Sequence, residues 1–299
     1  MSGTTYDVIG LGETMLSLVA RDGPLETASA FAATHGGAES NTLVALSRLG
    51  FRTAWISRLG DDPTGTRVRG ALELEGVDLR WVRTDPARST GLMLRDTRGG
   101  VRYWRAGSAA SALDPGALDG VPIADARAVL VTGITAMLGP GPQAAAIALL
   151  DRAGGLRAVD PNLRPGLWGS DRAHELVMPL LERCDVVLGG ERELASLVGG
   201  SGAGSARRCA KLGPSEVVVK RGADGAAVLE PDGAWRELRP PASDDVDPVG
   251  AGDAFNAAYL AARLDGASCL ESLRAGAAAG AAAAGVLGDV GARKQDIDV

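Results

Sequence analysis

Short apolar runs alternate with amphipathic segments along most of the chain. The runs predict buried strands at residues 7–11, 53–57, 128–132, 156–160, 185–188 and 217–220. The amphipathic segments predict helices at residues 39–49, 143–152, 171–183 and 192–198. Asp62 and Pro63 mark a further helix start, because aspartate is a favoured N-cap and proline is favoured at the first helical position. This alternation favours an α/β fold with a doubly wound, mostly parallel sheet and helices on both faces.

Two segments, residues 14–34 and 79–112, break this rhythm. Neither shows a convincing helical period, and residues 92–94 and 101–105 have the pattern of strands in a small antiparallel sheet. We therefore predict a β lid made of residues 14–34 and 79–112, with two long surface loops as the alternative. The core would then comprise residues 1–13, 35–78 and 113–299. Because open sheet edges are usually paired or covered, we expect a homodimer or a higher homo-oligomer formed through the lid.

Composition narrows the classes of function. Of the 299 residues, 45% are hydrophobic and 23% are charged, which is typical of a folded globular protein. The net charge of -6 and the lack of a basic stripe argue against nucleic acid as a partner. Glycine and proline interrupt the longest uncharged run, residues 128–150, so we expect no membrane span, and the N-terminus lacks a signal-peptide pattern. The three cysteines are far apart in sequence, which fits neither a zinc site nor a disulfide framework and favours the cytoplasm.

The strongest chemical signal is the segment DPVGAGDAF at residues 247–255. Proline and glycine exclude a helix before about Ala251, and a helical pattern follows. The backbone N–H groups of Gly250, Ala251 and Gly252 should therefore lie at a helix N-terminus, where they can bind an anion. Asp253 could accept the proton of an attacking hydroxyl, so the segment suits phosphoryl transfer. The alternative is a glycine N-cap followed by an aspartate that complements the helix dipole.

Two further segments offer weaker signals. Gly36 and Gly37 permit a hinge or a close ligand approach, and Asn41 could hydrogen-bond a polyol. A plain helix N-cap at Ser40 or Asn41 explains the same residues. The segment VVVKRGADGA at residues 217–226 predicts a β-hairpin with an Asp-Gly turn, and a nucleotide could lie across it.

Missing motifs exclude several enzyme classes. The chain has no GxxxxGK[ST] segment and no GxSxG segment, so it is neither a P-loop NTPase nor a hydrolase with a nucleophile elbow. Met15 replaces the third glycine of a dinucleotide-binding fingerprint, which disfavours a nucleotide-dependent oxidoreductase. His35 and His174 are the only histidines, and no acidic spacing around them suggests a metal cluster.

Taken together, these motifs resemble the ribokinase-like (phosphofructokinase-B) family of sugar kinases, from residue 8 to about residue 289. Both signatures of that family occur in order: GG and N at residues 36–41 with RLGD at residues 58–61, and DPVGAGD at residues 247–253. Within the family, four segments resemble 2-keto-3-deoxygluconate kinases. They are GGAESN at residues 36–41, YWRAGSA at residues 103–109, DPNLR at residues 160–164 with LW at residues 167–168, and VDPVGAGDAF at residues 246–255.

This resemblance implies roles for individual residues. Asp253 matches the catalytic base, and Gly250, Ala251 and Gly252 match an anion hole. The implied substrate contacts are Gly37, Ala38, Asn41, Tyr103, Arg105, Arg164, Asp253 and Asp289. The implied nucleotide contacts are Asn162, Arg164, Gly190, Lys220, Arg221, Gly222, Gly225, Gly250, Gly252 and Ala277. Glu193 would contact magnesium through water. Gly190 stands where the family usually has a polar side chain, and Met93 stands where close relatives often have a lid tyrosine.

The resemblance therefore predicts an ATP-dependent sugar-acid kinase that uses Mg²⁺ and phosphorylates the terminal hydroxyl of 2-keto-3-deoxygluconate. Arg105 could bind the carboxylate of such a substrate, because arginine binds carboxylates through two parallel hydrogen bonds. The alternative role for Arg105 is a solvated charge on an edge strand. The alternative functions are a neutral-sugar kinase of the fructokinase or ribokinase type and a non-catalytic sugar-binding protein on the same fold.

Overall fold

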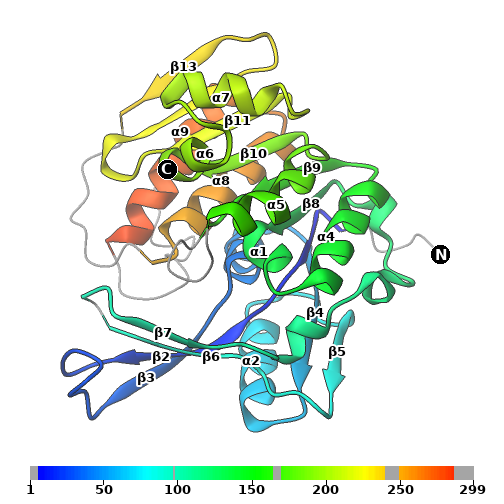
Figure 1. Ribbon diagram of the computed structural model, residues 1–299, viewed down its shortest axis with the longest axis vertical. Helices are drawn as coiled ribbons and strands as arrows, with labels where there is room; N and C mark the ends of the chain where they lie inside the picture. The colour runs from blue at the N-terminus through cyan, green and yellow to red at the C-terminus, as the bar shows by residue number, and fades with distance from the viewer. Residues whose placement is uncertain (1–5, 97, 164–169, 240–248, 286–299) are drawn as a thin grey trace.

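The computed structural model describes residues 6–96, 98–163, 170–239 and 249–285, and its centre is a sheet of nine strands (Figure 1). The strand order is β13-β12-β11-β10-β9-β8-β1-β4-β5. These strands are β1 (Val8–Leu11), β4 (Thr53–Gly60), β5 (Val82–Asp85), β8 (Ala128–Thr132), β9 (Leu156–Asp160), β10 (Val186–Gly190), β11 (Glu216–Lys220), β12 (Ala226–Leu229) and β13 (Trp235–Leu238). Neighbours from β11 to β5 are parallel, and β12 and β13 add an antiparallel edge. The predicted α/β fold with a mostly parallel sheet is confirmed.

Helices cover both faces of this sheet (Figure 1). One face carries α3 (Gly133–Ala136), α4 (Pro140–Arg152), α5 (Ser170–Leu181), α6 (Glu191–Val198) and α7 (Gly202–Ala210). The other carries α1 (Ala38–Arg48), α2 (Pro63–Leu74), α8 (Ala251–Leu264) and α9 (Cys269–Ala284). In β8, Val129 and Val131 belong to the first hydrophobic cluster, whereas Ala128 and Leu130 belong to the second. Burial on both faces explains why the strands have continuous apolar sequences.

A second, four-stranded sheet forms the lid beside this body, at the bottom of Figure 1. Its strands are β2 (Met15–Ala20), β3 (Phe31–Gly36), β6 (Leu92–Arg95) and β7 (Val101–Trp104), in the order β3-β2-β6-β7. The β2–β3 and β6–β7 pairs are antiparallel, but β2 and β6 are parallel, so the lid is a mixed sheet. Both segments expected in the lid therefore contribute strands to it, and β3 extends to the predicted hinge at Gly36.

Part of the segment predicted for the lid belongs to the large sheet instead. Strand β5 (Val82–Asp85) pairs in parallel with β4, from Ser57 to Gly60. Val82 is buried there, and the carboxylate of Asp85 accepts N–H groups from Ala87 and Arg88. The lid segment therefore begins after β5 rather than at residue 79, because this short strand gains its hydrogen bonds from β4.

Local sequence signals set several helix ends. The Asp62 Oδ1 atom accepts the N–H of Gly65 at 2.7 Å, and Pro63 is the first residue of α2, as predicted. Gly250 adopts a left-handed conformation with φ of 82° at the start of α8, which glycine tolerates without steric cost. Short 3₁₀ turns occur at Ala109–Ala112, Pro115–Leu118, Ile123–Asp125 and Gly222–Asp224.

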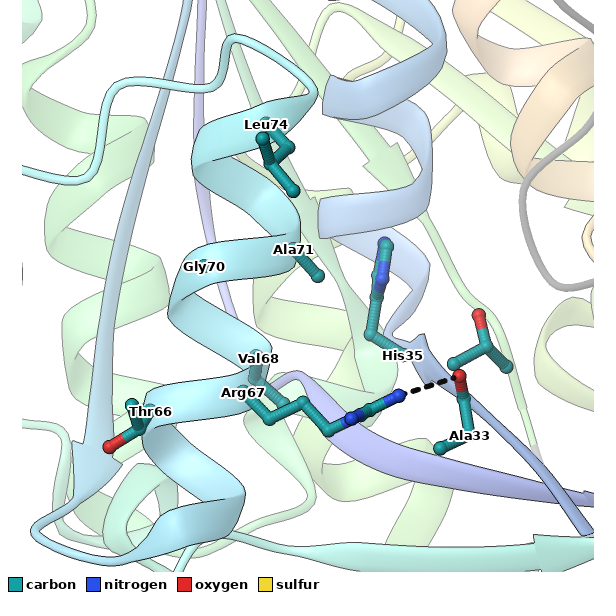
Figure 2. Close-up of a pocket in the computed structure, with 9 residues that line it drawn as sticks. Ala33, His35, Thr66, Arg67, Val68, Gly70, Ala71 and Leu74 are labelled. Carbon is teal, nitrogen blue, oxygen red and sulfur yellow. Dashed lines mark hydrogen bonds between the residues drawn. The ribbon is translucent and has the colours of Figure 1, made fainter.

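A small cavity of about 310 Å³ separates α2 from β3 (Figure 2). Its walls include Val68, Ala71 and Leu74 of α2 and the imidazole of His35 on β3. His35 is buried, and among the described residues its Nε2 atom has no hydrogen-bond partner. Burial lowers the pKa of His35, with a smaller opposing effect of Glu75 and a smaller reinforcing effect of Arg48. The folded protein therefore favours the neutral imidazole at this position.

The described residues contain no helix that is both long enough and apolar enough to cross a membrane. Cys184, Cys209 and Cys269 are buried free thiols. Burial raises the pKa of both Cys209 and Cys269 to about 12, so these thiols stay protonated at neutral pH. They act as small core side chains rather than as nucleophiles.

Candidate active site

A cavity of about 560 Å³ lies between the lid and the carboxyl ends of the parallel strands. Five residues at or just past the ends of β1, β8, β9, β10 and β11 line it: Glu13, Ile134, Asp160, Gly190 and Lys220. The lid contributes Met15, Met93, Arg95, Val101 and Tyr103, and Arg105 follows directly after β7. Ligands of doubly wound sheets bind at this edge. This cavity is therefore the candidate active site.

The first turn of α8 forms one wall of the cavity. Gly250 caps the helix, and the first intrahelical bond runs from the N–H of Ala254 to the carbonyl oxygen of Gly250. The N–H groups of Ala251 and Gly252 precede that bond, so they are not used within the helix. Together with the helix dipole they provide the predicted site for an anion, and the carboxylate of Asp253 lies beside it in the same turn.

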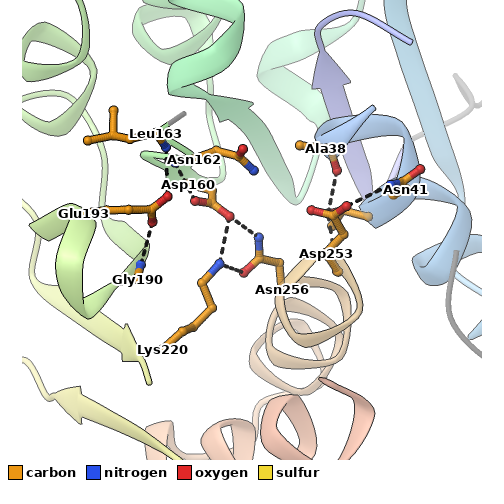
Figure 3. A network of polar contacts seen from close by, with 11 residues as sticks. Ala38, Asn41, Asp160, Asn162, Leu163, Gly190, Glu193, Lys220, Asp253 and Asn256 are labelled. Atoms are coloured by element: carbon orange, nitrogen blue, oxygen red, sulfur yellow. Dashed lines mark hydrogen bonds and ion pairs between the residues drawn. The ribbon is translucent and has the colours of Figure 1, made fainter. Parts of the chain in front are cut away.

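Asn41 holds the Asp253 carboxylate from the other side. Its Nδ2 atom donates to Asp253 Oδ2 at 2.8 Å, across 212 residues of sequence (Figure 3). Among the described residues, the buried Oδ1 atom of Asn41 accepts no hydrogen bond. Asn41 lines the cavity, and its amide N–H orients the carboxylate.

The glycine pair at residues 36–37 allows this geometry. Gly37 is the N-cap of α1, so the alternative of a plain cap at Ser40 or Asn41 is wrong. A Cβ atom on Gly37 would lie 2.3 Å from the carbonyl oxygen of Glu13, which no side chain tolerates. Close approach of two backbones, and not a turn, is what requires glycine here.

Glu39 fixes the start of α1 against the end of β8. Its Oε1 atom accepts hydrogen bonds from the N–H and hydroxyl of Thr132 and from the hydroxyl of Thr135, at 3.1, 2.7 and 2.6 Å. Complete burial raises the pKa of Glu39, and the threonine hydrogen bonds oppose that rise only in part. The Glu39 carboxylate has no exposed surface, so Glu39 holds α1 against β8 and does not itself contact a ligand.

Arg105 enters the cavity as a member of a buried ion pair. Its Nη2 atom lies 2.5 Å from Glu13 Oε2, and their side chains are 11% and 1% exposed. The Ser108 hydroxyl donates to Glu13 Oε1, and the guanidinium lies over the Tyr103 ring at 6.0 Å from its centroid. Among the described residues, the Arg105 Nε–H has no acceptor. Arg105 is therefore not a solvated edge charge, but a guanidinium held in place by Glu13 and Tyr103 at the wall of the cavity.

Glu193 closes the cavity beside β10. Its Oε1 atom accepts the N–H of Leu163 at 2.8 Å, and its Oε2 atom accepts the N–H of Gly190 at 2.7 Å. A Cβ atom on Gly190 would lie 2.9 Å from Glu193 Oε2, so glycine gives the carboxylate room at this position. Asn162 has φ of 41°, a left-handed conformation that asparagine tolerates better than most residues, and it lines the same wall.

Residues 4–294 match the pfkB family of carbohydrate kinases. The chain belongs to that family. The pfkB-family fold places a carboxylate beside a helix N-terminus in one cavity here, which is the arrangement that phosphoryl transfer requires.

Individual relatives align with nearly the whole of this pfkB-family chain. It is 33% identical to the 2-dehydro-3-deoxygalactonokinase of Haloferax volcanii, over 96% of this chain and 93% of the relative. It is also 33% identical to the 2-dehydro-3-deoxygluconokinase of Bacillus subtilis, over 95% of this chain and 91% of the relative. The solved structure of a PfkB protein from Polaromonas sp. JS666 matches with a TM-score of 0.84 at 37% identity, over 93% of this chain and 95% of that one. The family and the fold expected from the sequence are confirmed.

Other residues that sequence reasoning singled out lie outside the cavity or outside the described residues. Arg221 pairs with Glu191 and Glu237, and its guanidinium lies over the Trp235 ring. Gly222 and Gly225 have positive φ values in the turn between β11 and β12, which forms the predicted hairpin. Ala277 is buried in α9, within the hydrophobic cluster of that face. Two of the implied contacts, Arg164 and Asp289, fall outside the described residues.

Sequence reasoning missed several residues of this pfkB-family site. Glu13 belongs to no motif of its own, Asp160 lines the cavity and holds Lys220, and Asn256 becomes a site residue through its contacts with Lys220 and Asp160. Arg95 is a fully buried arginine on β6 that also lines the cavity. Asp160 and Lys220 end two predicted parallel strands, and the carboxyl ends of such strands share one edge, so that signal was available.

Proposed function

We propose that this pfkB-family protein transfers the γ-phosphoryl group of ATP to the terminal hydroxyl of a 2-keto-3-deoxy sugar acid, with 2-keto-3-deoxygluconate as the first candidate. The observation that carries the proposal is the oriented Arg105 guanidinium in the same cavity as Asp253 and the α8 N-terminus. A neutral sugar offers no group that requires a buried arginine. A sugar acid offers a carboxylate, which arginine recognises with planar, paired hydrogen bonds.

Asp253 would act as the general base. Its carboxylate, oriented by Asn41, accepts the proton of the sugar hydroxyl as the oxygen attacks phosphorus. The N–H groups of Ala251 and Gly252 face the charge that develops on the phosphoryl oxygens. Most of the rate enhancement then comes from orientation and from preorganised dipoles, because phosphoryl transfer asks for little covalent chemistry from the protein.

ATP and Mg²⁺ fit the remaining residues of the cavity. Lys220 at the end of β11 offers a cation inside the cavity beside the α8 N-terminus, and the turn at residues 221–225, which follows it outside the cavity, offers backbone groups for the rest of the nucleotide. Among the described residues, no group of three His, Cys, Asp or Glu side chains could hold a metal by itself. Carboxylate oxygen is a ligand that Mg²⁺ accepts, often through water, so Glu193 fits a water-mediated contact. Bound Mg²⁺ would neutralise charge on the phosphates.

An ATP-consumption assay with a panel of substrates tests the proposal. The panel comprises 2-keto-3-deoxygluconate, 2-keto-3-deoxygalactonate, gluconate, fructose and ribose, each with ATP and Mg²⁺. We expect the highest kcat/KM for one of the two 2-keto-3-deoxy acids, which correspond to the names of the Haloferax volcanii and Bacillus subtilis relatives. Preference for fructose or ribose would replace the proposal with the neutral-sugar alternative. No turnover with any of the five would favour a sugar-binding protein.

We also propose a cytoplasmic enzyme that works as a homo-oligomer joined through its lid. Three free buried thiols support a reducing compartment. The lid strands β3 and β7 are sheet edges, and Trp104 on β7 is 55% exposed, which supports a covered surface.

A further inference from the structure

Asp160, Lys220 and Asn256 form a closed set of hydrogen bonds at the floor of the cavity (Figure 3). Lys220 Nζ donates to Asp160 Oδ2 at 2.8 Å and to Asn256 Oδ1 at 3.0 Å, and Asn256 Nδ2 donates to the same Asp160 oxygen at 2.7 Å. The three residues come from the end of β9, the end of β11 and the second turn of α8. Each side chain is thus held by the other two.

The ammonium group of Lys220 has one donor left for a ligand. An ammonium carries three N–H groups, and Asp160 and Asn256 use two of them. Among the described residues, the third has no acceptor, and Lys220 lines the cavity with 17% of its side chain exposed. A Cβ atom on Gly252 would lie 3.7 Å from Lys220 Nζ, so the ammonium lies beside the N–H groups of the anion site.

The carboxylate that holds Lys220 is itself rigid. Asp160 is 3% exposed, and its second oxygen, Oδ1, accepts the N–H of Asn162 at 2.9 Å. Both oxygens therefore have fixed partners, and Asn256 is buried as well. Such a support keeps a charged group in one orientation before a ligand arrives, which is the condition for strong electrostatic stabilisation of a transition state.

We propose that Lys220 is a catalytic residue that contacts the phosphoryl group during its transfer, and that Asp160 and Asn256 are positioning residues for it. In the step, the bond between the sugar oxygen and the γ-phosphorus forms while the bond from that phosphorus to the β-γ bridging oxygen breaks. The bridging oxygen leaves with the electron pair on ADP, and the hydroxyl proton goes to Asp253. The Lys220 ammonium balances the charge on the phosphoryl oxygens next to Ala251 and Gly252. This inference rests on the proposed phosphoryl transfer but not on the identity of the sugar.

The first test replaces Lys220 with methionine, which keeps the length of the side chain and removes its charge. We expect kcat to fall about 10²- to 10³-fold, the scale seen when one donor to a transition-state oxyanion is removed. KM for the sugar should stay within about threefold. Lys211→Met is the matched control, because Lys211 is exposed at the end of α7, and it should change neither constant. A kcat near wild type in Lys220→Met would overturn the proposal.

Chemical rescue separates charge from structure. Lys220→Ala leaves space next to the cavity. Added ethylamine should raise the kcat of this variant at least tenfold, whereas an uncharged alcohol of similar size should not raise it. Asp160→Asn keeps the shape but frees the ammonium. We expect it to lower kcat about tenfold alone and to add nothing in combination with Lys220→Met, because the two residues act as one unit. Additive losses and no rescue by amine would show that the three residues only support the fold.

A binding measurement tests the same inference without any sugar. Calorimetry measures the affinity for a non-hydrolysable ATP analogue and for ADP, both with Mg²⁺. We expect Lys220→Met to bind the analogue at least tenfold more weakly than wild type and to bind ADP less than twofold more weakly. Equal losses for both nucleotides would place Lys220 elsewhere along the nucleotide and overturn the proposal. Because this readout needs no turnover, a failure of the sugar-kinase proposal and a failure of the Lys220 proposal give different results.

Discussion

Arg105 is the residue on which the substrate class depends, and its ion pair with Glu13 decides how it should be tested. At 2.5 Å and an effective dielectric constant of about 20, the attraction between the two charges is about 7 kcal/mol before desolvation is subtracted. Removing one partner of such a buried pair typically destabilises a protein by about 3–5 kcal/mol, because the other charge stays buried alone. Whole domains have about 5–15 kcal/mol of stability. Arg105→Ala alone would therefore confuse a loss of substrate binding with a loss of folding.

The double variant Arg105→Met with Glu13→Gln removes both charges and keeps most of the packing. Its stability should lie closer to wild type, since replacing a buried pair by neutral groups of similar volume is often nearly neutral. A charge-assisted hydrogen bond contributes about 1.5–3 kcal/mol, so KM for the sugar acid should rise roughly ten- to 150-fold. KM for a neutral sugar of similar size should change much less. Glu13→Gln alone is the control that keeps the arginine.

The assay compares kcat/KM for 2-keto-3-deoxygluconate and fructose in wild type, Glu13→Gln and the double variant, with thermal unfolding measured in parallel. Glu13→Gln also separates two effects of opposite sign. If Glu13 mainly repels the substrate carboxylate, KM for the acid falls in that variant. If Glu13 mainly orients the guanidinium, KM rises. Equal losses for acid and neutral sugar in the double variant would refute the assignment of Arg105 to a carboxylate.

Three further predictions concern the base, a buried histidine and the lid. Asp253→Asn keeps the size of the side chain but cannot accept the proton, so kcat should fall about 10²-fold or more while calorimetry shows little change in nucleotide affinity; near-wild-type turnover would remove the assignment. The folded-state pKa of His35 is lowered, so its contribution to stability is present above the unfolded value of 6.5 and is lost as pH falls below it. Denaturant titrations from pH 7 to pH 5 should therefore show a smaller loss of stability in His35→Gln than in wild type, whereas His174→Gln, at an exposed position, should match wild type. Light scattering at micromolar concentration should show a dimer or a larger species and should show monomer for Trp104→Glu on the lid edge; a wild-type monomer would contradict the lid interface.

The large sheet was predictable because its signals are local. Parallel strands that are buried on both faces have continuous apolar sequences, and α2 begins where Asp62 and Pro63 predict it. Pairing between distant segments carries no such signal. Strand β5 has only four residues with exposed positions in the middle, and it joins the sheet through hydrogen bonds to β4 that nothing in its own sequence specifies. The same reason hid the parallel pairing of β2 with β6.

The residues of the site also differ in whether local sequence or distant contacts determine their roles. Asp253 and Gly37 belong to segments in which glycine forces a particular backbone, so their roles follow from a few neighbouring residues. Glu13, Asp160 and Asn256 gain theirs from partners at a distance: 92 residues separate Glu13 from Arg105, 60 separate Asp160 from Lys220, and 96 separate Asp160 from Asn256. A carboxylate in a sequence does not reveal which cation it will neutralise after folding.

Arg105 and Lys220 are both paired with a carboxylate before a ligand binds, and this pairing affects what the cavity selects. Arg105 faces Glu13, and Lys220 faces Asp160, so neither end of the cavity presents an uncompensated positive charge from these two residues. The protein as a whole carries a net charge of -6, so long-range attraction for an anionic substrate is weak. Discrimination between sugars must then come from short-range contacts at the Arg105 end of the cavity, because the third N–H of Lys220 serves the phosphoryl group at the other end. Under the proposed function a sugar is accepted when it brings a carboxylate to Arg105 and a hydroxyl to Asp253 at the same time, which favours a molecule of definite length with an acid at one end.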